Sequence, residues 1–97
     1  MNDQEQSAYR QKLEARLDQW QAEIDKLQAK AAEASADARL EHDEQIQNLR
    51  HRQQEARAKL NKLQDAGSEA SEDLRKGLEQ AWDDLGEAVD KAKKRFG

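Results

Sequence analysis

Two histidines and a nearby glutamate are the first side chains in this sequence that could bind a metal ion. His42 and His51 are nine positions apart, so on one continuous helix they point about 180° from each other and cannot share an ion. His51 and Glu55 are four positions apart and could hold a divalent ion weakly. A solvated histidine beside a glutamate is the simpler explanation, and we expect no metal site.

The other patterns argue against catalysis. The four glycines, Gly67, Gly77, Gly86 and Gly97, stand apart and form no phosphate-binding loop. No HExxH, EF-hand or nucleophile-elbow motif occurs, and the acidic residues are spread around helices instead of converging on a cleft. The absence of cysteine excludes a thiol nucleophile and a cysteine-ligated zinc site. We therefore expect a protein that is not an enzyme and has no cofactor.

The locally basic stretch is KAKKR, residues 91–95. Lys and Arg number 17 against 21 Asp and Glu, so the chain lacks the basic stripe that nucleic-acid binding requires, and we expect no such binding. The cations of the stretch match the negative end of a helix dipole and could contact an anionic membrane surface weakly. They are Lys91, Lys93, Lys94 and Arg95.

The composition favours helices along the whole chain. Proline is absent, and Ala, Glu, Gln, Lys, Arg and Leu dominate, all of which have a low energetic cost in a helix. Opposite charges four positions apart would each add about a few tenths of a kcal/mol to a helix. These pairs are Glu55–Lys59, Glu72–Lys76, Glu87–Lys91 and Asp90–Lys94.

Large apolar residues recur at alternating spacings of three and four, which is the heptad pattern of a helix with one apolar face. The first run is Tyr9, Leu13, Leu17, Trp20, Ile24 and Leu27, followed by Ala31, Ala34 and Ala38. The second run, in a displaced register, is Ile46, Leu49, Gln53, Ala56, Leu60 and Leu63. Trp20 lies on the first stripe, so a core position explains it better than base stacking does.

The connection between the two runs has two interpretations. Residues 29–44 contain neither Gly nor Pro, and Ser35 alone has much capping preference. The register change can be absorbed as a stutter in one continuous helix. We therefore favour a long coiled-coil helix over residues 3–66, about 95 Å in length. A turn near Ser35 is the alternative.

A second helix is predicted over residues 69–96. Gly67 suits the position after a helix that ends near Ala66, and Ser68 or Ser71 suits an N-cap. An eleven-residue repeat gives about 3.67 residues per turn, so its apolar face stays nearly straight. That face comprises Ala70, Leu74, Leu78, Ala81, Trp82, Leu85, Val89, Ala92 and Phe96. Gly77 and Gly86 each weaken the helix by about 1 kcal/mol relative to Ala.

Three segments carry a resemblance to known proteins: LDQWQAEIDKLQAKA (17–31), IQNLRHRQQEARAKLNKL (46–63) and AWDDLGEAVDKAKKRF (81–96). Together they resemble small hydrophilic bacterial coiled-coil proteins, some described as stress-related. The eleven-residue repeat is similar to those of apolipoproteins and late embryogenesis abundant proteins. Ser71 stands where the bacterial coiled-coil proteins tend to have a Trp in the first copy of the eleven-residue repeat. The resemblance implies a helical protein with a role in stress tolerance, and it implies no catalytic or ligand residues.

These observations predict an all-α protein that forms a single structural unit and acts through contact with other helices. In the favoured arrangement, helix 69–96 folds back along residues 38–66 as an antiparallel hairpin. The apolar stripe from Tyr9 to Leu27 is then uncovered, so we expect a homo-oligomer, with an antiparallel dimer favoured, or binding to another helical protein. In the alternative, a turn near Ser35 makes a three-helix bundle that covers the stripe internally.

A second functional class is a reversible lipid-surface or desiccation-type protector. Here the apolar face of helix 69–96 enters a lipid interface while residues 91–95 attract anionic headgroups. Acidic residues on the polar face, Asp83, Asp84 and Glu87, argue against this class. The N-terminus shows no basic start followed by an apolar run, and no apolar stretch approaches 18 residues, so we expect a cytoplasmic protein.

Overall fold

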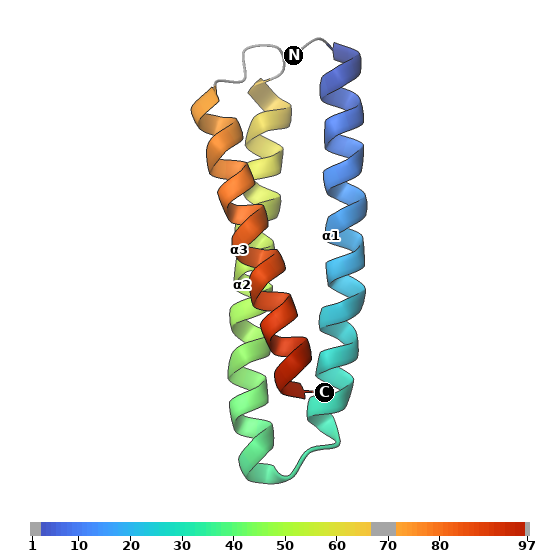
Figure 1. Ribbon diagram of the computed structural model, residues 1–97, viewed down its shortest axis with the longest axis vertical. Helices are drawn as coiled ribbons and strands as arrows, with labels where there is room; N and C mark the ends of the chain where they lie inside the picture. The colour runs from blue at the N-terminus through green and yellow to red at the C-terminus, as the bar shows by residue number, and fades with distance from the viewer. Residues whose placement is uncertain (1–2, 67–71, 97) are drawn as a thin grey trace.

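Three helices make up the part of the chain that the structure describes. The computed structural model describes residues 3–66 and 72–96. Its helices are α1 (Asp3–Ala32), α2 (Ala36–Ala66) and α3 (Glu72–Phe96). Figure 1 shows that α2 runs antiparallel to both α1 and α3, so that α1 and α3 are parallel. The all-α class is therefore confirmed.

The chain reverses direction at residues 33–35. Glu33 N donates to Lys30 O and Ala34 N donates to Ala31 O, each at 3.1 Å, which closes the end of α1 with bonds of the tighter i to i−3 type. Arg39 N donates to Ser35 O at 2.7 Å, so the Ser35 carbonyl accepts the first hydrogen bond of α2. The predictions of one continuous helix over 3–66 and of a two-helix hairpin are therefore wrong. The alternative, a turn near Ser35 in a three-helix arrangement, is confirmed.

The other helix boundaries agree more closely with the sequence. Helix α2 ends at Ala66, as predicted. Helix α3 begins at Glu72, three residues later than the predicted start at 69, while the proposed capping residues at 67, 68 and 71 lie outside the described part of the chain. Glu72 and Asp73 occupy the first turn of α3, and Lys93, Lys94 and Arg95 occupy its last turn. These charges match the helix dipole at both ends.

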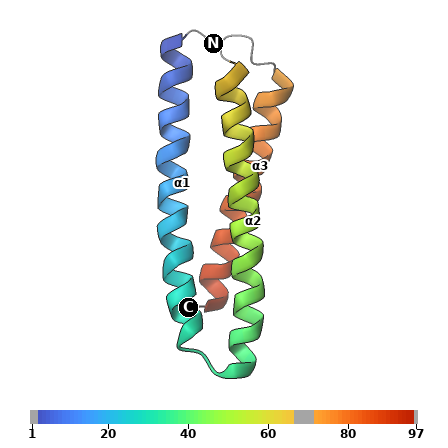
Figure 2. The same ribbon diagram turned by 180° about the vertical axis from the view of Figure 1, so that it is seen from behind.

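The bundle is short because the helices lie side by side. Its principal extents are 51 × 19 × 18 Å, about half the length expected for a single 64-residue helix. Figures 1 and 2 both show the C-terminal end of α3 close to α1 and short of the turn that joins α1 to α2. Helix α3 therefore covers one side of the α1–α2 pair, except near the turn that joins α1 to α2.

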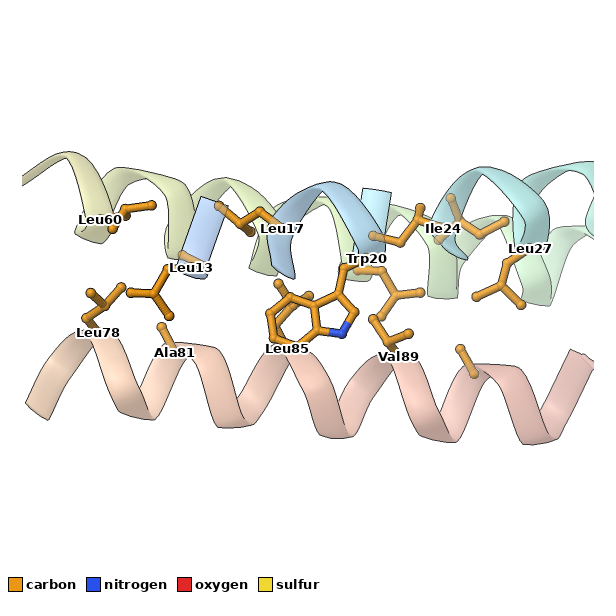
Figure 3. Close-up of a cluster of buried hydrophobic side chains, with 14 of the residues drawn as sticks. Leu13, Leu17, Trp20, Ile24, Leu27, Leu60, Leu78, Ala81, Leu85 and Val89 are labelled. Carbon is orange, nitrogen blue, oxygen red and sulfur yellow. The ribbon is translucent and has the colours of Figure 1, made fainter. Parts of the chain in front are cut away.

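The core lies along the common axis of the three helices and consists almost entirely of the two heptad runs and the eleven-residue face. Figure 3 shows side chains of α1 and α3 pointing toward one another across this axis. Burying a Leu, Ile or Val side chain stabilises the fold by about 1.5–3 kcal/mol. The buried apolar residues are Leu13, Leu17, Trp20, Ile24, Leu27, Ala31, Ile46, Leu49, Ala56, Leu60, Leu63, Leu78, Ala81, Leu85, Val89 and Ala92.

Ion pairs lie on the solvent-exposed faces of the helices. Two predicted pairs are formed, with Lys76 Nζ 3.5 Å from Glu72 Oε1 and Lys91 Nζ 3.1 Å from Glu87 Oε1. Glu55, which the sequence paired with Lys59, lies 3.0 Å from His51 Nε2 instead. These side chains are exposed, so each Lys–Glu pair contributes only about 0.3–0.5 kcal/mol.

Candidate functional site

The apolar stripe of α1 is covered inside the chain. We expected the stripe from Tyr9 to Leu27 to be free for a partner, and this expectation is wrong because α2 and α3 both pack against it. Ile24 and Leu17 have no solvent exposure at all. The three-helix bundle covers the part of the stripe from Leu17 to Leu27, which a two-helix hairpin would leave exposed, whereas Tyr9 at its start is only partly buried.

The predicted seam residues of the other two helices are also internal. Ile46, Leu49, Leu60 and Leu63 are buried on α2, and Leu78, Leu85 and Val89 are buried on α3. Three of the predicted residues, Tyr9, Leu74 and Trp82, are only partly buried and lie at the edge of the core. The side chain of Phe96 lies outside the described part of the structure. Tyr9, Leu74 and Trp82 therefore lie where the core meets the solvent.

An aromatic cluster joins α1 to α3 at the middle of the bundle. Trp20 and Trp82 lie with their ring centroids 5.5 Å apart and their planes inclined by 54°, a favourable tilted geometry. The Arg16 guanidinium lies 5.4 Å from the Trp20 ring centroid, within the range of a cation–π contact. Figure 3 shows the Trp20 indole reaching from α1 toward α3 beside Leu85. Trp20 thus lies in the core, as the sequence predicted, whereas Trp82 lies at its edge.

A groove runs beside this cluster between α1 and α3. We call it the α1/α3 groove; its floor is formed by Tyr9, Leu13 and Trp82. It comprises two adjoining hollows of about 430 and 130 Å³. Lys12, Ala15, Arg16 and Gln19 line its α1 side, while Leu78, Glu79 and Asp83 line its α3 side. The groove thus combines an apolar, aromatic floor with charged edges.

Tyr9 links the two sides of this groove. Burial raises the pKa of the Tyr9 hydroxyl, and the negative charge of Glu79, to which the hydroxyl is hydrogen-bonded, raises that pKa further. Arg75 opposes the shift. The neutral phenol is therefore the form that fits between α1 and α3.

A second groove, of about 640 Å³, lies between α2 and α3. Lys91, Lys94 and Arg95 of the predicted basic stretch line it together with Arg52, and Asp84 and Glu87 lie on the same surface. Arg95 Nη1 also approaches Glu41 Oε1 of α2 at 3.9 Å, and Lys93 Nζ approaches Glu23 Oε2 of α1 at 3.7 Å. Part of the basic stretch thus lies within reach of acidic side chains on α1 and α2, in solvent-accessible pairs that contribute little to stability.

A polar cluster between α1 and α2 was not anticipated. Gln53 occupies an apolar position of the second run, is buried, and donates a hydrogen bond from Nε2 to Gln21 Oε1. Gln21 in turn donates to Asp25 Oδ1 at 2.9 Å, and Arg50 reaches the same oxygen at 3.1 Å. The signal in the sequence was a lone Gln at a core position of the heptad. Such a polar position favours one register of two packed helices over others.

The two histidines are separated, as expected. His51 lies on the exposed face of α2 beside Glu55, and His42 lies further toward the start of the same helix. Within residues 3–66 and 72–96, no three His, Asp or Glu side chains are grouped closely enough to hold a metal ion. Nor is any helix in these ranges long and apolar enough to cross a lipid bilayer.

Comparison with known proteins adds no family. No protein-family model, no curated protein and no solved structure matches the chain. The likeness to stress-related coiled-coil proteins therefore stays a prediction, and function has to be argued from the bundle itself.

Proposed function

We propose that the chain is a non-enzymatic helical interaction protein that associates with a second copy of itself or with another helical protein. The observation that carries this proposal is the α1/α3 groove, where the partly buried rings of Tyr9 and Trp82 lie at the edge of the core. Aromatic side chains that combine an apolar ring with a polar tip are enriched where protein surfaces meet. Contact, and not chemical conversion, is the role this surface supports.

The charged side chains support the same proposal. Glu72 and Lys76 form an exposed ion pair along α3, and His51 and Glu55 form an exposed polar contact along α2. The polar residues nearest to the core, Gln21 and Gln53, are committed to the contact between α1 and α2. These groups solubilise and align helices, which is the work of a structural module.

Sedimentation equilibrium of the purified chain tests the proposal. We expect the measured mass to rise from that of the 11.1 kDa chain toward twice that value as concentration increases from about 1 µM to 1 mM. A mass that stays at one chain throughout, together with no binding to any helical protein in a pull-down from cells, would contradict it.

Lipid-surface protection is the second candidate, because α3 is by far the most strongly amphipathic of the three helices and ends in Lys93, Lys94 and Arg95. To lay its apolar face on a bilayer, α3 must leave α1 and α2, which separates Trp82 from Trp20. Vesicles containing anionic lipid should then change the tryptophan emission of the chain, whereas neutral vesicles should not. Identical spectra with both vesicle types would dismiss this candidate.

The physiological part of the proposal is a contribution to stress tolerance. It is supported by the resemblance of residues 17–31, 46–63 and 81–96 to stress-related coiled-coil proteins and by the charged, helical composition. Deletion of the gene should reduce growth under osmotic or oxidative challenge. Unchanged growth under both conditions would remove this part and leave the helical interaction to be judged by sedimentation.

A further inference from the structure

The two edges of the α1/α3 groove carry opposite charges. Lys12 and Arg16 stand on the α1 edge, Glu79 and Asp83 stand on the α3 edge, and all four residues are exposed. In residues 3–66 and 72–96, no ion pair joins the two edges. Arg16 covers the Trp20 ring instead, and Glu79 holds the Tyr9 hydroxyl. The groove therefore separates charges that would attract one another if they could meet.

These opposite charges lie at the same level along the bundle. Tyr9, less than one turn before Lys12, is hydrogen-bonded to Glu79, and Leu13 lines the same hollow as Asp83. Helices α1 and α3 run parallel, so the two edges keep the same order along the axis. A partner that meets this face must therefore present a negative edge to α1 and a positive edge to α3 at equal height.

We propose that the partner is a second copy of this chain, docked on the α1/α3 groove by a two-fold axis parallel to the bundle. Rotation by half a turn about that axis keeps each level and exchanges the two edges, so α1 of each copy faces α3 of the other. Lys12 and Arg16 of each copy then face the acidic edge of the other copy, and the two-fold axis repeats this contact on both sides of the interface. The proposal rests on the proposed self-association and specifies its surface.

The charges select this symmetry over the alternative. A two-fold axis perpendicular to the bundle would place α1 against α1 and α3 against α3. Lys12 and Arg16 of one copy would then face the basic α1 edge of the other copy and be repelled. The expected dimer is therefore parallel, unlike the antiparallel dimer that the sequence suggested. Its centre would be the apolar floor of Tyr9, Leu13 and Trp82, and the small exposed side chain of Ala15 would let a helix approach closely.

A charge-exchange experiment tests this surface. One variant carries Lys12→Glu and Arg16→Glu, which makes both edges acidic; the other carries Glu79→Lys and Asp83→Lys, which makes both edges basic. Because all four positions are exposed, circular dichroism should show unchanged helicity in both variants. Sedimentation of each variant alone should show a dissociation constant at least about 100-fold weaker than that of the wild-type chain at low salt.

The mixture of the two variants provides the decisive arm. Each edge of one variant then faces an opposite edge of the other, so an equimolar mixture should form a dimer within about threefold of the wild-type affinity. Two variants that dimerise alone as well as the wild type would overturn the proposed surface while leaving self-association standing. A wild-type chain that stays monomeric would overturn the second copy as the occupant and leave the groove to the helix of another protein.

Cross-linking gives a readout that does not depend on affinity. The sequence contains no cysteine, so Lys12→Cys and Glu79→Cys each introduce a single thiol. Under oxidation, mixing the two variants should give mainly disulfides between positions 12 and 79. Disulfides formed mainly between two copies of position 12 would reject the parallel arrangement in favour of one that pairs α1 with α1.

Discussion

The Trp20 indole lies against the backbone of Gly86: a Cβ placed at position 86 would be 3.2 Å from Trp20 Cζ2. That separation is shorter than nine in ten Cβ contacts in proteins, so the ring would have to shift by a few tenths of an ångström before a side chain could fit. Trp20 is 9% exposed and its ring also packs against Trp82, with the ring centroids 5.5 Å apart, so little free space surrounds it. A glycine that weakens α3 as an isolated helix therefore allows α1 and α3 to pack closely in the bundle.

The two helical glycines of α3 should respond differently to alanine. Gly77 has no heavy atom within 4 Å of an added Cβ, so Gly77→Ala should raise the free energy of unfolding by about 0.5–1 kcal/mol through helix propensity alone. Gly86→Ala should give no gain, because the displaced Trp20 ring offsets the propensity. Gly86→Leu should lower the free energy of unfolding by about 1–3 kcal/mol. Urea denaturation measures all three, and equal gains at both glycines would contradict the close approach.

The centre of the core should tolerate truncation poorly. Leu85 is fully buried between the helices, and Leu85→Ala should lower the free energy of unfolding by about 2–5 kcal/mol because it removes apolar contacts and leaves a cavity. Leu40 provides the matched control, since its side chain is 69% exposed on α2. Leu40→Ala should change stability by no more than about 0.5 kcal/mol. Similar losses from both substitutions would mean that α3 is not packed on the core in solution.

Gln53, the buried glutamine of α2, should fix the register of α2 against α1 but should not raise the free energy of unfolding. Gln53→Leu places an apolar side chain of similar size at a core position, while the partner Gln21 stays half-exposed and can hydrate. We expect the free energy of unfolding to rise by about 1 kcal/mol in urea denaturation. Gln54→Leu, at the neighbouring exposed position, is the control and should have almost no effect. A loss of more than about 1 kcal/mol at position 53 would show that its bond to Gln21 outweighs the gain from apolar burial.

The spacing of apolar residues predicted which side chains form the core, but it did not predict the path of the chain. Leu17 and Ile24 lie on the buried face that the heptads indicated, and α2 ends at Ala66 before the glycine that was expected to stop it. The turn at residues 33–35 carries no Gly or Pro, so local signals left it ambiguous with a helix.

Tertiary packing decides the turn. Interrupting a helix over three residues forfeits on the order of a few kcal/mol, because only a few hydrogen bonds and favourable dihedrals are lost. Leaving the stripe from Leu13 to Leu27 exposed on a long rod would forgo about 1.5–3 kcal/mol for each large apolar side chain. The second quantity is several times the first, so the chain folds back. The α1/α3 groove was likewise hidden from the sequence, because its floor and edges come from helices about seventy residues apart.

Stability at alkaline pH should reveal the raised pKa of the Tyr9 hydroxyl, which burial and Glu79 both cause. Burial and the nearby carboxylate raise the pKa of the Tyr9 hydroxyl in the folded chain, whereas the unfolded chain has the ordinary value of about 10. Between these two values the folded chain binds the proton more tightly than the unfolded chain does, so the stabilisation present below pH 10 is lost as the pH rises through the folded pKa. Lysines titrate in the same range, so the measurement compares the wild type with Tyr9→Phe, which lacks the hydroxyl but keeps the ring. The difference in free energy of unfolding between the two chains should change in favour of Tyr9→Phe as the pH rises from 9 to 11, and a constant difference would show that the pKa of the Tyr9 hydroxyl is not raised in the folded chain.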